Sequence, residues 1–380
     1  MSDEAQGCRG RQSGVTTRDL PSIDPLELAG AEQVADLIDN VYAKSGYNAR
    51  RLAEAAQLFS KMINDNATIC LTLAGAMTPI GMSGVLNALI RAGFIDCIIS
   101  TGANLYHDLH RPFRCPMVQG HHIVDDNELA EAGIARIYDV FIEEDATLMA
   151  TDRIIIEALR QMDHAGPLST AKLHHELGRV VSSSADRPEW SLLATAAQYE
   201  LPIYTSSPGD SSIAMNLTVP HLFGRPVQLD PLRDVIETAA IVWSAERNGV
   251  VIVGGGSPKN FYLQTQPTIH QIFMDSSRGG HDYFIQLGVD SPQWGGLSGA
   301  TPSEARSWGK VKDAVVNNVV VYSCASLTLP LLAQYVLVRN RPRPARRLYS
   351  RLAELTAAFR EEAASNPAFQ ETLQASVGGQ

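Results

Sequence analysis

The sequence lacks the features that mark secreted and membrane-spanning proteins. Only five cysteines occur among 380 residues, and none forms a Cys-x-x-Cys pair. This argues against both a disulfide framework and a cysteine-based zinc site. No uncharged apolar run reaches the roughly 18 residues that a membrane span requires, and the polar N-terminus has no apolar signal core. The expected location is therefore cytoplasmic, with no membrane partner.

Positive charge is also scarce. The chain has 31 Lys and Arg against 41 Asp and Glu, which gives a net charge of -10. Non-specific nucleic-acid binding needs clustered cations, so no nucleic-acid partner is expected. An acidic surface attracts polycationic small molecules instead. The one basic cluster has six Arg between Arg339 and Arg351, and we interpret it as a solvated face or a subunit contact.

Apolar runs alternate with helical stretches along most of the chain. Helical spacing marks 28–65, 82–93 and 231–249, and 125–200 is predicted to be mostly helical. Strands are predicted at 67–73, 94–100, 201–205, 250–253, 282–287 and 318–323. Short, non-alternating strands between helices predict an α/β fold, a Rossmann-like parallel sheet with helices on both faces and helical additions at both ends.

The composition also predicts the limits of this domain. Residues 1–20 are polar and are expected to form a disordered arm. A single α/β domain is expected over 21–345, and a C-terminal helix and tail over 346–380.

Ligands of parallel sheets bind outside the carboxyl ends of the strands. Gly254, Gly255 and Gly256 follow one predicted strand and open a helix. This arrangement suits either a nucleotide pyrophosphate or a tight turn. Thr101 and Gly102 follow another strand in the segment STGAN. Asp210, in SSPGDSS, suits a ribose-hydroxyl acceptor or equally an Asx-turn or helix N-cap.

Two further groups of residues suggest chemistry. His107 and His110 are three residues apart, but a catalytic zinc needs three protein ligands, so no metal site is predicted. Trp308 lies beside Lys310, and an indole that desolvates this ammonium would depress its pKa, as a nucleophilic lysine requires. The alternative is a surface lysine beside a packed tryptophan.

Taken together, these segments resemble the deoxyhypusine synthase family. The most similar piece is SGATPSEARSWGKV (298–311), with GGGSPKN (254–260) upstream. STGAN, NELAEAGIARI (127–137) and ASLTLPLL (325–332) follow the family's order as well. The resemblance covers about residues 30–338, and it implies a Rossmann-like homotetramer with active sites between subunits.

The resemblance also implies a reaction. In the family, bound NAD+ takes a hydride from the carbon beside the secondary amine of spermidine. A lysine then holds the aminobutyl fragment as an imine, 1,3-diaminopropane leaves, and an acceptor amine takes the fragment before the hydride returns. The acceptor is a translation-factor lysine in deoxyhypusine synthase and putrescine in homospermidine-forming relatives.

Carried over to this sequence, Lys310 is the covalent catalytic residue. Glu304 and Trp308 match substrate-binding positions, and Asn260 stands at a third. The positions that the resemblance and the strand ends assign to NAD binding are Thr101, Gly102, Asp210, Gly254, Gly255, Gly256 and Ser298.

Several positions depart from the family pattern. Asn260 stands where the family has a catalytic histidine, and Trp294 and Leu297 replace two aspartates. Met215 and His107 replace further acids, and Cys324 replaces a nucleotide-contacting aspartate. Each lost charge-assisted contact costs about 1.5–3 kcal/mol, so the amine preference should change.

The preferred hypothesis is an NAD-dependent aminobutyl transferase of a divergent, deoxyhypusine synthase-like branch that acts on polyamines, with a small acceptor such as putrescine. Two alternatives stay open. One is authentic deoxyhypusine synthesis on a protein substrate, and the other is a nucleotide-binding relative that has lost catalysis.

Overall fold

The computed structural model describes residues 17, 20–25, 31–162, 166–277 and 279–377. Most of the predicted disordered arm, 1–20, therefore lies outside the described residues. Within the described part of the chain, no helix combines the length and apolar character needed to cross a membrane.

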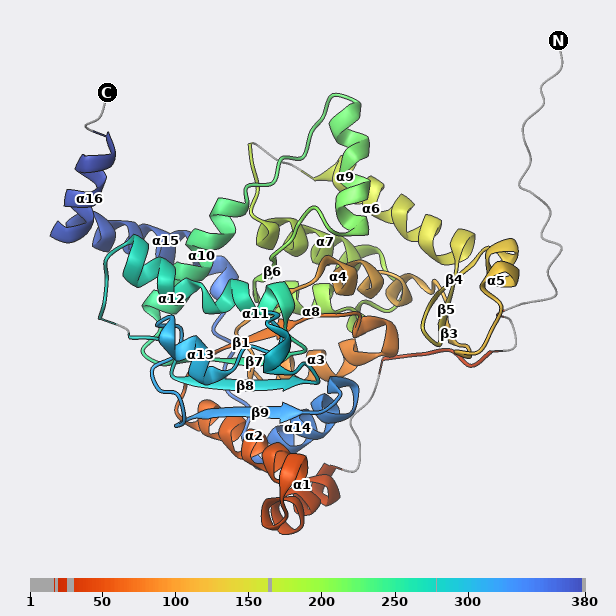
Figure 1. The fold of residues 1–380 in the computed structure, drawn as a ribbon. Coiled ribbons are helices and arrows are strands. Elements are labelled where there is room, and N and C mark those ends of the chain that lie inside the picture. Colours follow the sequence, from red (N-terminus) through yellow and green to blue (C-terminus); the bar gives the residue numbers. More distant parts are fainter. Residues whose placement is uncertain (1–16, 18–19, 26–30, 163–165, 278, 378–380) are drawn as a thin grey trace.

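Six parallel strands form the main sheet (Figure 1), in the order β6-β2-β1-β7-β8-β9. The strands are β1 (Thr68–Leu73), β2 (Cys97–Ser100), β6 (Ile203–Thr205), β7 (Asn248–Val253), β8 (Tyr283–Gly288) and β9 (Asn318–Tyr322). The predicted strands and their parallel arrangement are thus confirmed. The order is the 3-2-1-4-5-6 pattern of Rossmann folds, whose strand order reverses between β1 and β7.

Helices cover both faces of this sheet, because alternate strand residues point to opposite sides. Ile69 and Leu71 join one apolar core with α2, α3, α8 and α14. Cys70 and Ile252 join a second core with α10, α11 and α15. The helices on the first face are α2 (Tyr47–Asn64), α3 (Met82–Arg91), α8 (Leu192–Gln198) and α14 (Ala325–Arg339). Helix α1 (Ala31–Asn40) joins the same core. The helices on the second face are α10 (Pro231–Ser244), α11 (Gly256–Leu263) and α15 (Leu348–Ser365).

Shorter or more peripheral helices complete the fold. They are α4 (Gly102–Asp108), α5 (Asp126–Ala132), α6 (Ala150–Gln161), α7 (Thr170–Ser184), α9 (Ser212–Leu222), α12 (Thr265–Pro267), α13 (Pro302–Ser307) and α16 (Pro367–Val377). Two helices, α15 and α16, occupy the C-terminal region where the sequence predicted one helix and a tail.

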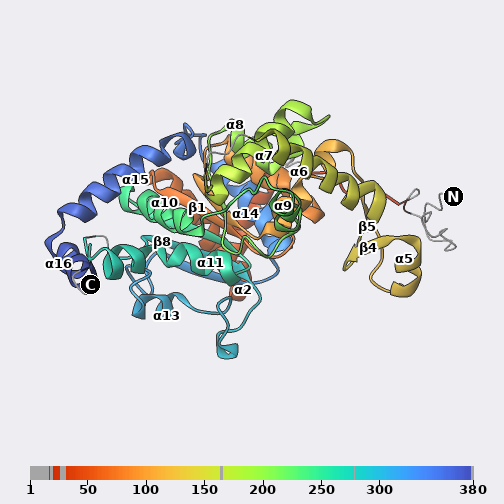
Figure 2. The same ribbon diagram turned by 90° about the horizontal axis from the view of Figure 1, so that it is seen from above.

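A second, antiparallel sheet was missed by the sequence prediction. It contains β3 (Met117–Gln119), β4 (Ile134–Ile137) and β5 (Val140–Glu143), in the order β3-β5-β4. The prediction that 125–200 is mostly helical is confirmed, but it missed β4 and β5 within that range. These strands are three or four residues long, α5 lies between β3 and β4, and Arg136 and Asp139 interrupt the apolar residues of β4 and β5. Figures 1 and 2 show this sheet at the end of the molecule opposite α15 and α16.

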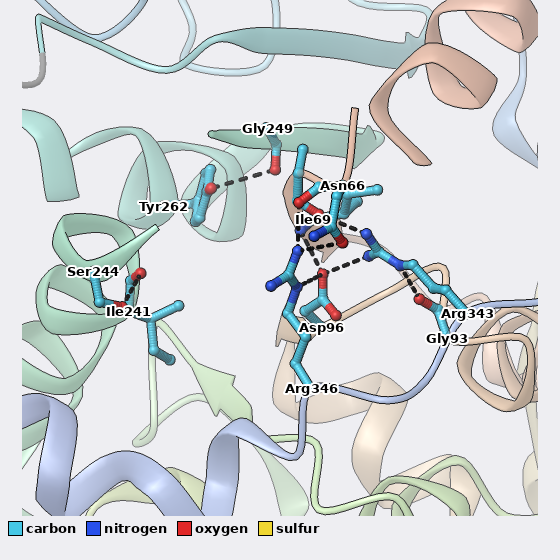
Figure 3. A network of polar contacts seen from close by, with 11 residues as sticks. Asn66, Ile69, Gly93, Asp96, Ile241, Ser244, Gly249, Tyr262, Arg343 and Arg346 are labelled. Atoms are coloured by element: carbon cyan, nitrogen blue, oxygen red, sulfur yellow. Dashed lines mark hydrogen bonds and ion pairs between the residues drawn. The ribbon is translucent and has the colours of Figure 1, made fainter. Parts of the chain in front are cut away.

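A buried ion pair joins the C-terminal region to the amino edge of the main sheet (Figure 3). Arg343 contacts Asp96 at 2.7 Å, with side chains 12% and 1% exposed. Arg343 also donates to the carbonyls of Gly93 and Ala67, and Arg346 lies 3.5 Å from Asp96. The interpretation of the basic cluster as a solvated face or subunit contact is wrong for these two arginines, because they satisfy a buried carboxylate and backbone carbonyls.

Replacing Arg343 by Met should leave Asp96 in a buried position with a single, more distant arginine. Removing one partner of a buried ion pair costs about 3–5 kcal/mol. We expect a loss of that size in the free energy of unfolding, measured by urea denaturation. Arg351→Met is the matched control, because Arg351 is an exposed partner of Glu354 and such pairs contribute about 1 kcal/mol or less. Equal losses in the two variants would contradict the assignment.

Candidate active site

The exits of β1, β2 and β7 meet where the strand order reverses. Thr101, which follows β2, donates its hydroxyl to the carbonyl of Gly75, which follows β1, at 2.9 Å. Gly75 and Gly254 both have positive φ angles, +68° and +77°, which glycine adopts at little cost. A side chain at Gly75 would meet no atom within 4 Å, so this exit borders open space.

Asn104 organises these exits, and the sequence prediction missed it. It is fully buried, and its amide donates to Thr101 Oγ1 and the Gly75 carbonyl at 2.9 and 3.0 Å. Its Oδ1 accepts from the backbone N–H groups of Met77 and Thr78. The sequence feature that could have indicated this role is the position of Asn104 inside STGAN, just after a predicted strand. An amide side chain carries both donors and an acceptor, so it can connect two loops by hydrogen bonds.

The exit of β6 packs against the same region. A side chain at Gly102 would lie 2.1 Å from Ser211 Cβ, so the Asp210 loop touches the start of α4. Asp210 itself is exposed, and the cap of α9 is the Ser211 hydroxyl. The N-cap alternative for Asp210 is therefore wrong. Among the described residues its carboxylate has no hydrogen-bond partner, which leaves it available to a ligand.

The three glycines after β7 form a bend on which Ser298 is packed. A side chain at Gly255 would lie 2.6 Å from Ser298 Cα. The Gly256 N–H donates to Ser298 Oγ at 2.9 Å, so this N–H is engaged within the protein. Ser257 donates to Ser206 Oγ at 2.9 Å, which joins the exits of β6 and β7.

Lys310 lies just after α13, and its side chain contacts Asn260 of α11, the helix that follows this bend. Its Nζ donates to Asn260 Oδ1 at 2.8 Å and lies 5.6 Å from the centre of the Trp308 ring. The amine is half-buried, and this burial lowers the pKa of Lys310, whereas the nearby Glu304 carboxylate raises it. Trp308 is 59% exposed, so the indole has a free surface beside the amine.

The backbone around Lys310 is fixed from both sides. Gly309 has φ +68°, and a side chain there would lie 2.9 Å from the His270 ring. The Lys310 carbonyl accepts from the His281 N–H, next to a bridge between His281 and Val311. These contacts fix the backbone on either side of Lys310, and its side chain is held separately by Asn260.

The structure thus brings the predicted residues together in two groups. Thr101, Gly102 and Asp210 lie at the exits of β2 and β6. Lys310, Asn260, Trp308 and Glu304 lie beside α11 and α13. The glycine bend and Ser298 lie between the two groups.

His107 and His110 bond to each other instead of presenting two free rings. His107 Nδ1 and His110 Nε2 are 2.9 Å apart, and His110 Nδ1 is 2.6 Å from the Thr151 hydroxyl. Burial lowers the pKa of His107 to about 4. In the described part of the chain, no group of three His, Cys, Asp or Glu side chains is arranged to hold a metal ion.

A sequence model of the deoxyhypusine synthase family matches residues 36–336. The chain belongs to this family. It is 46% identical over 343 residues to a "Deoxyhypusine synthase-like protein" of Nostoc sp., with 88% of each chain covered. It is 38% identical over 301 residues to "Probable deoxyhypusine synthase 2" of Methanosarcina acetivorans, with 79% of this chain and 85% of that protein covered.

A solved structure described as "a putative deoxyhypusine synthase from Entamoeba histolytica" shares the fold. Its TM-score is 0.55 at 14% identity, and the match covers 85% of this chain and 99% of that one. The predicted family and fold are therefore confirmed. Family membership points to a transferase that moves an aminobutyl group, in a family that uses NAD.

Replacing Glu304 by Gln should lower the pKa of Lys310 further, because the carboxylate stabilises the ammonium form. The neutral fraction of Lys310 at a given pH should then rise. Competitive acetylation between pH 7 and 11, read by mass spectrometry, gives the midpoint for this lysine. Glu354→Gln on the exposed face of α15 is the control and should leave the midpoint unchanged. An unchanged or higher midpoint in E304Q would contradict the electrostatic role of Glu304.

Proposed function

We propose that this protein is an NAD-dependent transferase that moves the aminobutyl group of a polyamine to a small amine such as putrescine, through an imine on Lys310. One observation carries the proposal. The Lys310 amine is half-buried between a neutral amide oxygen and an exposed indole. A desolvated amine that is held by a neutral acceptor keeps its nucleophilic form available near neutral pH.

The strand exits fit a dinucleotide. They lie at the strand-order reversal of a 3-2-1-4-5-6 sheet, which is where such cofactors bind. Gly75 borders open space, and the Asp210 carboxylate is exposed. The residues proposed to hold NAD are Thr101, Gly102, Asp210, Gly254, Gly255, Gly256 and Ser298. When bound, NAD supplies reversible removal of a hydride from the carbon beside the amine nitrogen.

Lys310 performs the transfer between the two hydride steps. Its neutral amine adds to the carbon of the donor's C=N bond, and the bond from that carbon to the leaving amine then breaks. With spermidine as donor, 1,3-diaminopropane leaves and takes the proton that Lys310 gives up. The acceptor amine displaces Lys310 in the same way, and return of the hydride gives a secondary amine. Spermidine and putrescine thus give homospermidine and 1,3-diaminopropane, with no net oxidation.

The other residues orient the amine. Trp308 presents an aromatic face that suits an alkyl ammonium chain, and Glu304 supplies the negative charge near Lys310. Asn260 accepts a hydrogen bond from Lys310 but does not titrate, so it positions the amine and leaves proton transfer to the reacting amines. Among the described residues, Glu304 is the carboxylate whose charge acts on Lys310, and it supports a small diamine as the acceptor.

We also propose a homotetramer, with active sites between subunits. Helix α9, which projects at the top of Figure 1, supports it. Met215, Leu222 and Phe223 on and just after α9 are 67%, 75% and 81% exposed. Apolar side chains that gather on one exposed helix mark an interaction surface, and the start of α9 adjoins Asp210.

The covalent step is tested by borohydride trapping. Enzyme, NAD+ and labelled spermidine or putrescine are mixed and then reduced, and the labelled peptide is identified by mass spectrometry. We expect label on Lys310 in the wild type and in Lys312→Ala, and no label in Lys310→Ala. Lys312 is the matched control, because it is an exposed lysine that pairs with Asp282. Equal label on Lys310→Ala would refute the nucleophile assignment.

Products of the same mixtures separate the alternative functions. Homospermidine from free diamines supports the proposal. Aminobutylation of a translation-factor lysine without transfer to free diamines would identify an authentic deoxyhypusine synthase. Binding of NAD without any adduct would identify a relative that has lost catalysis.

The subunit arrangement gives a separate prediction. Sedimentation equilibrium should give about four times the chain mass of 41.2 kDa. Met215→Glu with Phe223→Glu should reduce that mass, because a buried apolar contact would acquire unpaired charges. A wild-type monomer would contradict the proposal.

A further inference from the structure

Lys259, which the function described above does not use, is a buried lysine with every donor engaged. Its side chain is 2% exposed. Its Nζ donates to Gln286 Oε1 at 2.9 Å, to the Ser298 carbonyl at 3.2 Å and to the Ala300 carbonyl at 2.7 Å. Burial lowers the pKa of Lys259 to about 8; Lys310 also lowers it, whereas Glu304 and Asp290 raise it.

Gln286 extends this network to the glycine bend. It lies inside the apolar strand β8, where its position pairs with Ile252 of β7. Its Nε2 donates to the Gly254 carbonyl at 2.9 Å and to the Ser298 carbonyl at 2.6 Å. One amide therefore joins the Lys259 ammonium, the bend and the segment that contains Ser298.

Ser298 is held at each of its polar side-chain and carbonyl atoms. Its carbonyl accepts from Lys259 and Gln286, and its hydroxyl accepts from the Gly256 N–H. Its Cα would lie 2.6 Å from a side chain at Gly255. The backbone at Ser298 therefore packs directly against the glycine bend, which leaves no room for a side chain at Gly255.

The residue after Lys259 makes the connection to the nucleophile. Asn260 accepts from Lys310 Nζ, so consecutive residues of α11 hold the Ser298 segment and the reactive amine. A buried ammonium is costly to desolvate, and replacing a whole buried charged network by well-packed apolar groups is often neutral for stability. The presence of this network next to the reactive amine therefore suggests a role in positioning as well as in stability.

We propose that Lys259 and Gln286 are positioning residues for the transfer. They hold the Ser298–Ala300 segment against the glycine bend and thereby align the Lys310 amine with the strand exits. The inference rests on the proposed function of Lys310, since alignment matters only if that amine reacts. A misplacement of about 1 Å lowers a rate by up to about a hundredfold.

The test uses Lys259→Met and Gln286→Leu in the full chain. Gln293→Leu is the matched control, because Gln293 is exposed in the connection from β8 to α13 that also contains Ser298. Single-turnover borohydride trapping gives a rate constant and an amplitude for the Lys310 adduct. We expect both variants to lower the rate constant about tenfold or more, with the amplitude retained and the half-saturating amine concentration within about threefold of wild type. The control should match the wild type.

A second measurement needs no cofactor or amine. Hydrogen–deuterium exchange should become faster in residues 291–300 of both variants and stay unchanged in Gln293→Leu. Faster hydrogen exchange with an unchanged rate constant of adduct formation would overturn the positioning role. A variant that lowers only the amplitude of the adduct would also overturn it, because a lower amplitude reports a fraction of misfolded enzyme. Absence of any adduct in the wild type would instead refute the proposed function.

Discussion

Close contact between Ser298 and the glycine bend is the constraint on which the site depends. No side chain fits at Gly255, because Ser298 Cα occupies that space at 2.6 Å. The segment beyond Ser298 continues into α13 and then to Lys310. The contact therefore fixes the start of a short connection that ends at the reactive amine, while Asn260 fixes its end. Backbone packing and one hydrogen bond thus locate a side chain that regular secondary structure does not hold.

Lys259 and Lys310, 51 positions apart, differ in chemical role because their side chains have different surroundings. Lys259 is enclosed and donates three hydrogen bonds to three acceptors, so its ammonium acts as a structural cation. Lys310 is half-buried and makes one bond to a neutral oxygen, so its lone pair becomes accessible once a proton leaves. Burial lowers the pKa of both amines. The number of acceptors, more than the pKa, separates the two roles.

Much of the fold was predictable because long apolar runs coincide with the buried strands. The small antiparallel sheet was not, because its strands lie among helical segments and Arg136 and Asp139 interrupt their apolar residues. Arg343 and Lys259 escaped prediction for another reason. Sequence patterns assign charged side chains to solvent, and only the fold shows that Asp96 or backbone carbonyls lie within reach. The residues around Lys310 were accessible through family resemblance, whereas Asn104 and Gln286 became evident from their contacts.

The ion pair of Asp96 and Arg343 lies at the amino edge of the sheet, whereas the candidate site occupies the carboxyl edge. The amino edge is held by a buried ion pair of two opposite charges, whereas the carboxyl edge is held by hydrogen bonds from one buried ammonium and from neutral amides and hydroxyls. Selection for a new substrate would therefore act on residues that contribute little to keeping the sheet assembled. Because the two edges are separate, residues at the carboxyl edge can change to accept different amines while the Asp96–Arg343 ion pair that stabilises the sheet stays unchanged.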